Sequence, residues 1–143
     1  MKTECSPVLL AEDEETDALI LRMAFEKAGI ARTLVVVSDG QEAVDYLCGN
    51  GPYKDRSAHP LPALLVLDLK MPRMNGFDVL AWLASRPEFK DLPAVVLSSS
   101  ADSHDLARAR QLGACDYFVK PHAVSDYVKV AEMIHARWLA RSA

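Results

Sequence analysis

Short apolar segments alternate with amphipathic segments along the whole chain. Five segments rich in Val and Leu have the length of strands, and runs this uniformly apolar are typical of parallel strands that helices cover on both faces. They occupy residues 8–11, 34–37, 63–67, 94–97 and 117–119. A helical pattern follows each one, so the order of elements predicts a doubly wound α/β domain with a five-stranded parallel sheet.

The five expected helices are marked by apolar residues one turn apart. They cover residues 20–28, 41–48, 76–85 and 104–112, and the last begins near residue 124. Gly29 follows the first and Gly113 the fourth, as expected of residues that terminate helices. The last helix also carries Val130, Met133 and Leu139 off its main apolar stripe. This extra surface suits either a homodimer or docking face, or a wider contact with the core.

Residues 49–62 are irregular and contain several glycines and prolines. This stretch is too long for a minimal turn between a helix and a strand, so it is predicted to be an elaborated surface loop, inserted either neutrally or for a function. Residues 1–6 are expected to form a short N-terminal tail. The chain of 143 residues has the size of one domain with a single core, and no output domain is expected.

Composition and charge argue against several classes of function. The formal net charge is −4, without the basic excess of a nucleic-acid binder. No apolar run is long enough to span a bilayer, and the start of the chain lacks the pattern of a signal peptide. Three widely spaced cysteines without a CxxC pair suggest reduced thiols, and therefore a cytoplasmic protein.

Polar residues stand directly after four of the predicted strands. Glu12 and Asp13 follow the first strand, Asp68 the third, Ser98 the fourth and Lys120 the fifth. In an open parallel sheet, ligands bind at the carboxyl ends of the strands, so these side chains are expected to converge on one rim. Each also has a plainer interpretation. The first two acids could simply open the first helix, and the hydroxyl and the lysine could be ordinary surface groups.

Together these residues predict chemistry that none of them indicates alone. Three carboxylates in one pocket repel each other unless a cation is bound, and their hard oxygens suit Mg²⁺. An aspartate can attack phosphorus to form an aspartyl phosphate, and Asp68 is the expected nucleophile. The metal, Lys120 and Ser98 are the donors that would stabilise the charge of the transferring group.

Four segments give the chain a resemblance to the receiver domains of two-component response regulators over nearly its full length. They are LLAEDE, LLVLDLKMPRMNGFDVL, PAVVLSSS and GACDYFVKP. The resemblance implies a flavodoxin-like fold with strand order 2-1-3-4-5 and helices on both faces. It also implies a phosphoacceptor signalling protein rather than an enzyme, which receives phosphoryl from a histidine kinase on Asp68 and then changes its interaction surface.

The resemblance also assigns roles to the residues of the rim. Asp13 and Asp68 would ligate Mg²⁺ together with the backbone carbonyl of Lys70, and Glu12 would act through a bound water. Lys120 would pair with the phosphoryl group.

Two residues would carry the switch. Ser98 would hydrogen-bond the phosphoryl group, and Tyr117 stands where the family has an aromatic ring that swings inward when the hydroxyl moves. An aromatic ring simply packed on an edge strand fits the same position. The expected output is a shift of the surface formed by the fourth helix, the fifth strand and the fifth helix.

The insertion indicates a subgroup. The sequences GNGPYKDR at residues 49–56, PLP at 60–62 and LKMPR at 69–73 resemble the single-domain regulators paired with phytochrome-type histidine kinases. That resemblance implies a bacteriophytochrome kinase as partner, with a histidine phosphotransfer protein or a second copy of the chain as further candidates.

Three other classes of protein share parts of this pattern. An FMN-binding flavodoxin needs a phosphate loop after the first strand, where this chain has four consecutive acids that would repel phosphate. A phosphatase with an aspartate nucleophile would have a second aspartate two residues after Asp68, where this chain has Lys70. A receiver-like interaction module that works without phosphorylation stays open.

Overall fold

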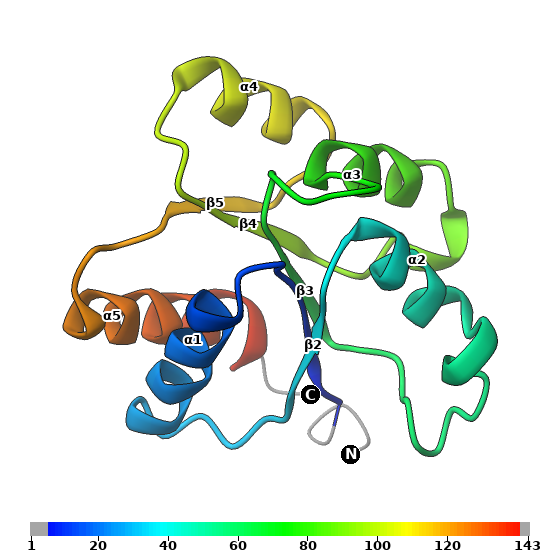
Figure 1. The fold of residues 1–143 in the computed structure, drawn as a ribbon, viewed down its shortest axis with the longest axis horizontal. Helices are drawn as coiled ribbons and strands as arrows, with labels where there is room; N and C mark the ends of the chain where they lie inside the picture. The colour runs from blue at the N-terminus through cyan, green and yellow to red at the C-terminus, as the bar shows by residue number, and fades with distance from the viewer. Residues whose placement is uncertain (1–5, 141–143) are drawn as a thin grey trace.

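A computed structural model describes residues 6–140. Its core is a parallel sheet in the order β2-β1-β3-β4-β5 (Figure 1), which confirms the predicted topology. The strands are β1 (Val8–Ala11), β2 (Leu34–Val37), β3 (Leu64–Leu67), β4 (Ala94–Ser98) and β5 (Asp116–Val119). Their bounds differ from the predicted ones by one residue at most, and Ser98 is the last residue of β4 rather than the first after it.

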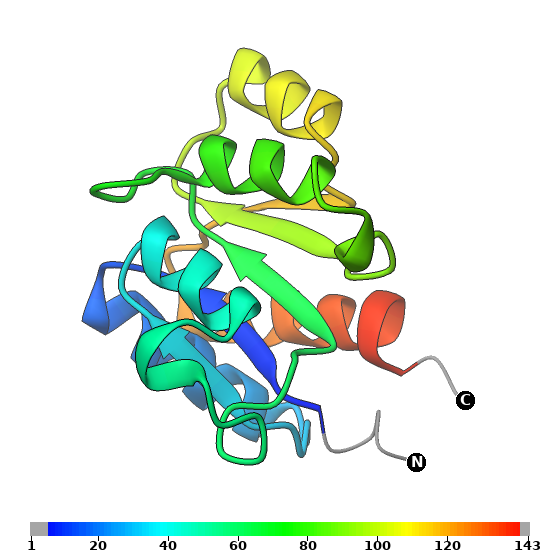
Figure 2. The ribbon, with the colours of Figure 1, turned by 90° about the vertical axis from the view of Figure 1, so that its right-hand side faces the viewer.

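Helices cover the sheet on both sides, as predicted. They are α1 (Glu15–Lys27), α2 (Gly40–Cys48), α3 (Gly76–Ala84), α4 (Ser103–Gln111) and α5 (Val124–Ile134), followed by a π-helical turn at His135–Leu139. Helices α1 and α5 pack on one face, and α2, α3 and α4 on the other (Figures 1 and 2). Each face therefore has its own layer of buried apolar side chains.

The three central strands are buried along their whole length, as uniformly apolar runs predict. The two edge strands are not. Val36 of β2 is 36% exposed and Val119 of β5 is 44% exposed. The prediction of burial on both faces was therefore wrong for parts of the edge strands, because each edge strand has only one strand beside it and incomplete cover from the helices.

Gly29 ends α1 in the way the sequence predicted. Its φ is +76°, a left-handed conformation that costs glycine little. The Gly29 N–H donates to the Glu26 carbonyl at 3.1 Å, and the Ile30 N–H donates to the Phe25 carbonyl at 3.0 Å. These two bonds make a Schellman motif, which satisfies carbonyls at the end of the helix and turns the chain toward β2.

Residues 49–62 contain a short 3₁₀ turn, Gly51–Tyr53, and pack against the end of α2. The Tyr46 hydroxyl donates to the Pro60 carbonyl at 2.8 Å, and the ring of Tyr46 lies 5.0 Å from that of Tyr53. Arg56 donates to the Leu47 carbonyl at 2.7 Å and to the His59 carbonyl at 2.9 Å. The predicted surface loop is therefore held against α2 by Tyr46 of the helix and by Arg56 of the loop.

The off-stripe residues of the last helix do not form a docking face. Val130 and Leu139 are buried in the core layer beneath α1 and α5, and only Met133 of the three is exposed. The wider core contact is thus the correct explanation for Val130 and Leu139. Because both residues are buried, they do not support the predicted homodimer.

Candidate functional site

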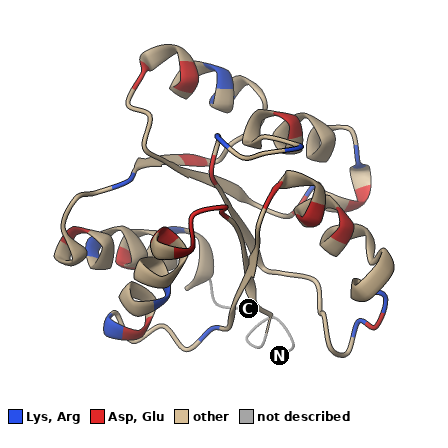
Figure 3. Cartoon of the chain, viewed as in Figure 1, with Lys and Arg blue, Asp and Glu red and all other residues tan. Residues whose placement is uncertain are grey.

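Three carboxylates meet where β1 and β3 end. Glu12 and Asp13 follow β1 and Asp68 follows β3, and one oxygen from each lies within 4.8 Å of the others. Glu12 and Asp68 are buried, whereas Asp13 is exposed. Figure 3 shows acidic positions gathered at this edge of the sheet. Three hard oxygen donors, one of them open to solvent, fit a divalent cation such as Mg²⁺ that keeps part of its water shell.

The plainer interpretation of Glu12 and Asp13 as helix-opening acids is wrong. Helix α1 begins at Glu15, and its N-cap is Glu14. The Glu14 N–H donates to the Glu12 carboxylate at 3.1 Å. Both predicted acids therefore precede the helix and face the site.

Gly76 fixes the path of the chain after Asp68. The Gly76 N–H donates to the Leu69 carbonyl at 3.0 Å. A Cβ at this position would lie 2.4 Å from the Asp68 carbonyl oxygen, so only glycine lets α3 begin this close to the strand end. Lys70 lies in the same loop with its side chain exposed. The role of its carbonyl as a metal ligand stays a prediction.

Lys120 is the centre of the charge arrangement. Its ammonium nitrogen lies 2.8 Å from Glu12, 2.8 Å from Asp17 and 3.1 Å from Asp68. Its side chain is only 9% exposed, so the interpretation as a surface lysine is wrong. Burial by itself would lower the pKa of Lys120, but hydrogen bonds from its ammonium to Asp17 and Glu12, together with the Asp68 charge, raise that pKa above its usual value. Lys120 is a permanent cation here.

The pKa of Glu12 is also raised, but here burial is the cause. Burial raises the pKa of the Glu12 carboxyl from 4.5 to about 7; the hydrogen bond from Lys120 opposes this shift, and the nearby charge of Asp68 adds to it. The proton is therefore held more tightly in the folded chain than in the unfolded chain. As the pH rises from 4.5 to 7, the unfolded chain loses this proton first, and the folded state loses stability.

This gives a first prediction, for the metal-free protein in EDTA. Glu12→Gln removes the titrating group, so the variant should gain roughly 2 kcal/mol of unfolding free energy over wild type between pH 4.5 and pH 8. Urea unfolding at both pH values measures the gain. Glu132→Gln, at an exposed glutamate of α5, is the matched control and should show no such pH dependence. A difference between Glu12→Gln and wild type that stays constant with pH would contradict the assignment.

Ser98 and Tyr117 are joined through the segment that follows β4. The Ser100 N–H donates to the Ser98 hydroxyl oxygen at 3.1 Å, and the Tyr117 hydroxyl donates to the Ser100 carbonyl at 2.8 Å. Both Ser98 and Tyr117 are buried. Movement of the Ser98 hydroxyl would thus be transmitted to Tyr117 by two hydrogen bonds, both of which involve the backbone of Ser100. Their role as a switch remains a prediction.

Two features of the site were missed from the sequence. Asp17 of α1 contacts Lys120, and its place in the first turn of the helix after the acids of β1 is the only hint of this contact in the sequence. Arg73, in the loop after Asp68, has a φ of +63° and contacts Asp39 at 2.8 Å. Asp39 also accepts from the Glu42 N–H as the N-cap of α2, so this pair ties the loop to the neighbouring helix.

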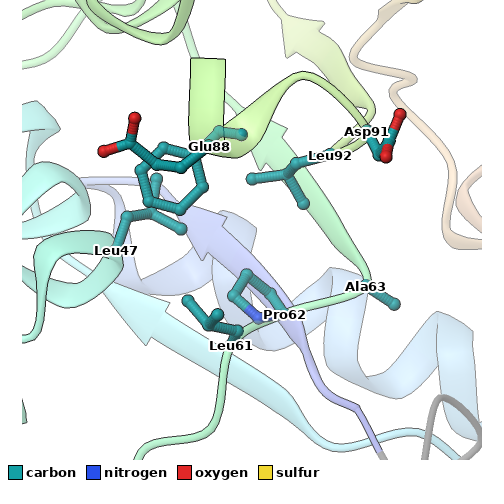
Figure 4. A pocket seen from close by; sticks show the side chains of 8 residues that line it. Leu47, Leu61, Pro62, Ala63, Glu88, Asp91 and Leu92 are labelled. Atoms are coloured by element: carbon teal, nitrogen blue, oxygen red, sulfur yellow. The ribbon is translucent and has the colours of Figure 1, made fainter. Parts of the chain in front are cut away.

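A separate cavity of about 330 Å³ lies at the opposite end of the sheet, near the start of β3 (Figure 4). Its walls are largely apolar, with two acids, Glu88 and Asp91, among them. They offer no arrangement for binding a metal or a phosphoryl group. A metal ion or a phosphoryl group would therefore find suitable ligands at the acidic rim rather than in this cavity.

The family model for the response regulator receiver domain matches residues 8–132, which is most of the chain. The chain belongs to this family. Within residues 6–140 of this receiver domain, no helix has the length and apolarity needed to cross a membrane.

Three regulators illustrate the relationship. Response regulator Rcp1 of Synechocystis is 30% identical over 97% of this chain and 95% of its own length. Its Mn²⁺-bound crystal structure matches with a TM-score of 0.84. Response regulator RPA3017, described in red light signaling of R. palustris, is 36% identical with a TM-score of 0.88, over 96% of each chain. The phosphorylated cyanobacterial phytochrome response regulator RcpA is 30% identical with a TM-score of 0.87, over 97% of each chain. This receiver domain is therefore a signalling protein similar to phytochrome-associated regulators.

Proposed function

We propose that this receiver domain is the phosphoacceptor of a two-component phosphorelay, and that Asp68 accepts the phosphoryl group in the presence of Mg²⁺. The observation that carries the proposal is the position of the Asp68 carboxylate. It belongs to a cluster of three acids suited to a hard cation, and one of its oxygens lies 3.1 Å from the Lys120 ammonium. A carboxylate between a cation site and a fixed ammonium can attack a dianionic phosphoryl group that it would otherwise repel.

The step is a displacement at phosphorus. One oxygen of Asp68 forms the new bond to phosphorus as the bond from phosphorus to the donor nitrogen of a phosphohistidine breaks, and the imidazole leaves with that electron pair. Glu12, Asp13, Asp68 and the carbonyl of Lys70 would hold the metal, Glu12 through a water. The metal supplies positive charge to the phosphoryl oxygens.

Two other side chains would serve the phosphorylated form. Lys120 would donate to a phosphoryl oxygen, and the Ser98 hydroxyl would donate to another. Tyr117 would follow Ser98 and change the surface of α4, β5 and α5.

The similarity to RPA3017 and RcpA supports a phytochrome-type histidine kinase as the phosphoryl donor. We infer a cytoplasmic location from such a partner and from three widely spaced cysteines without a CxxC pair. A histidine phosphotransfer protein and a second copy of the chain are further candidate partners.

The test is labelling of the whole protein by acetyl phosphate. We expect one phosphoryl group per chain in Mg²⁺, read by intact mass spectrometry, and none after EDTA, because the acids then lack their neutralising cation. Mn²⁺ should restore labelling. A folded protein that binds Mg²⁺ but takes up no phosphoryl group from acetyl phosphate or a phosphorylated kinase would instead favour an interaction module that works without phosphorylation.

A further inference from the structure

Of the carboxylates that contact the Lys120 ammonium within residues 6–140, only that of Asp17 does not come from the end of a strand. It lies in the first turn of α1, 103 positions before Lys120 in the sequence, and its carboxylate accepts a hydrogen bond from the ammonium at 2.8 Å. Its side chain is 30% exposed, whereas those of Glu12 and Asp68 are 2% and 7% exposed. The contact therefore ties helix α1 to the end of β5 at the border of the site.

An ammonium group has three N–H donors, and Lys120 has three carboxylates within reach. Phosphorylation of Asp68 would turn one of these acceptors into a neutral acyl oxygen and bring negatively charged phosphoryl oxygens beside it. One N–H would then pass from Asp68 to the phosphoryl group. Glu12 and Asp17 can keep the other two N–H groups and hold the ammonium in place.

We propose that Asp17 is a positioning residue for the phosphoryl transfer that acts through Lys120. This inference rests on the proposed function of Asp68. Asp17 anchors the outer side of the ammonium, so that Lys120 points at the position where the charge of the transferring group develops. Among the described residues, Asp17 is not one of the three acids that could hold a metal ion together.

A role for Asp17 in starting α1 is the plainer alternative, because acids in a first turn stabilise a helix. Glu15 occupies the same first turn and offers the same charge to the helix. Among the described residues, the carboxylates within 4.0 Å of the Lys120 ammonium are those of Glu12, Asp17 and Asp68, so Glu15 is not one of them. Glu15→Ala is therefore a matched control that removes a helix-opening acid and leaves Lys120 anchored.

The experiment measures the labelling rate by acetyl phosphate over a range of donor concentrations in Mg²⁺. Asp17→Ala should lower the maximum rate about tenfold, the scale of one hydrogen bond to a charged group. Asp17→Asn keeps an oxygen that can accept a hydrogen bond from Lys120 but removes a negative charge that repels acetyl phosphate. This variant should lower the apparent KM for acetyl phosphate and keep the maximum rate within about threefold of wild type. Glu15→Ala should match wild type. A maximum rate for Asp17→Ala equal to that of Glu15→Ala would overturn the proposal.

A double-variant comparison shows whether Asp17 acts through Lys120. In a Lys120→Met background, Asp17→Ala should have no further effect on the rate, since the group it positions is gone. A second tenfold loss in that background would overturn the proposal.

Nuclear magnetic resonance gives a readout that does not need phosphorylation. The Lys120 ammonium should give a slowly exchanging ¹H–¹⁵N signal in wild type and Glu15→Ala, and Asp17→Ala should lose it because one N–H becomes free to exchange with water. Persistence of that signal in Asp17→Ala would overturn the proposal even if the double variant does not fold. Absence of labelling in wild type would contradict the function of Asp68, while this signal would still decide the role of Asp17.

Discussion

Asp68→Asn is expected to reduce labelling by acetyl phosphate in Mg²⁺ to less than about one-thousandth of the wild-type rate, because loss of a nucleophile removes the reaction path itself. The amide keeps nearly the size of the carboxylate but carries no charge. It cannot form the acyl phosphate, and it is a poor ligand for the cation that Glu12 and Asp13 would share with it. Rates from intact mass spectrometry at several donor concentrations measure the loss.

The control for this variant is Asp91→Asn. Asp91 is exposed and lines the cavity at the other end of the sheet, so its charge lies far from the acidic rim. We expect this control to be labelled like wild type. Circular dichroism should show the same fold for both variants. Labelling of Asp68→Asn at even a tenth of the wild-type rate would mean that another side chain accepts the phosphoryl group, and the assignment of Asp68 would fail.

The position of the acidic rim could be predicted because it depends on local features of the sequence. A parallel strand is a short apolar run, and the first polar residues after it stand at the edge of the sheet where ligands bind. This places Glu12, Asp13 and Asp68 together once the strands are known, and the structure confirms that they meet. The motif around Lys120 then completes the arrangement.

Features that depend on distant contacts could not be predicted in this way. Asp17 contacts Lys120, which is 103 positions away in the sequence. From α1 alone, an acid at position 17 is explained equally well as a residue that stabilises the first turn of the helix. Leu139 lies off the apolar stripe only if α-helical spacing continues to the end of the segment. The π-helical turn at His135–Leu139 has more residues per turn, so it rotates Leu139 into the core.

The exposure of the edge strands also depends on contacts that are distant in the sequence. Val36 and Val119 are as apolar as residues of the central strands, yet both are partly exposed. Composition identifies a strand in a parallel sheet, but the place of that strand in the order decides how far helices cover it. The order β2-β1-β3-β4-β5 came from the resemblance to the receiver family and not from the pattern of apolar residues.

Lys120→Met is expected to cost about 3–5 kcal/mol of unfolding free energy at pH 8 in EDTA, because loss of one partner leaves buried charges uncompensated. The side chains of Glu12 and Asp68 are 2% and 7% exposed, so water cannot replace the ammonium that both of them contact. Methionine has a similar length, and the effect therefore reports charge and hydrogen bonding more than lost volume. Urea unfolding measures it. Lys129→Met, at a lysine that is 74% exposed and 3.9 Å from Asp126, should show no measurable loss.

The pH and metal dependence of this loss separates electrostatics from packing. Glu12 has a pKa of about 7 in the folded chain, so it is protonated at pH 5 and no longer needs a cation beside it. The cost of Lys120→Met should therefore be smaller at pH 5 than at pH 8. Mg²⁺ at pH 8 should also restore part of the stability, because the ion binds the folded acids and supplies the missing positive charge. A loss that is equal at both pH values and unaffected by Mg²⁺ would show that Lys120 stabilises the fold through packing. The proposed phosphoryl transfer would then need another cation.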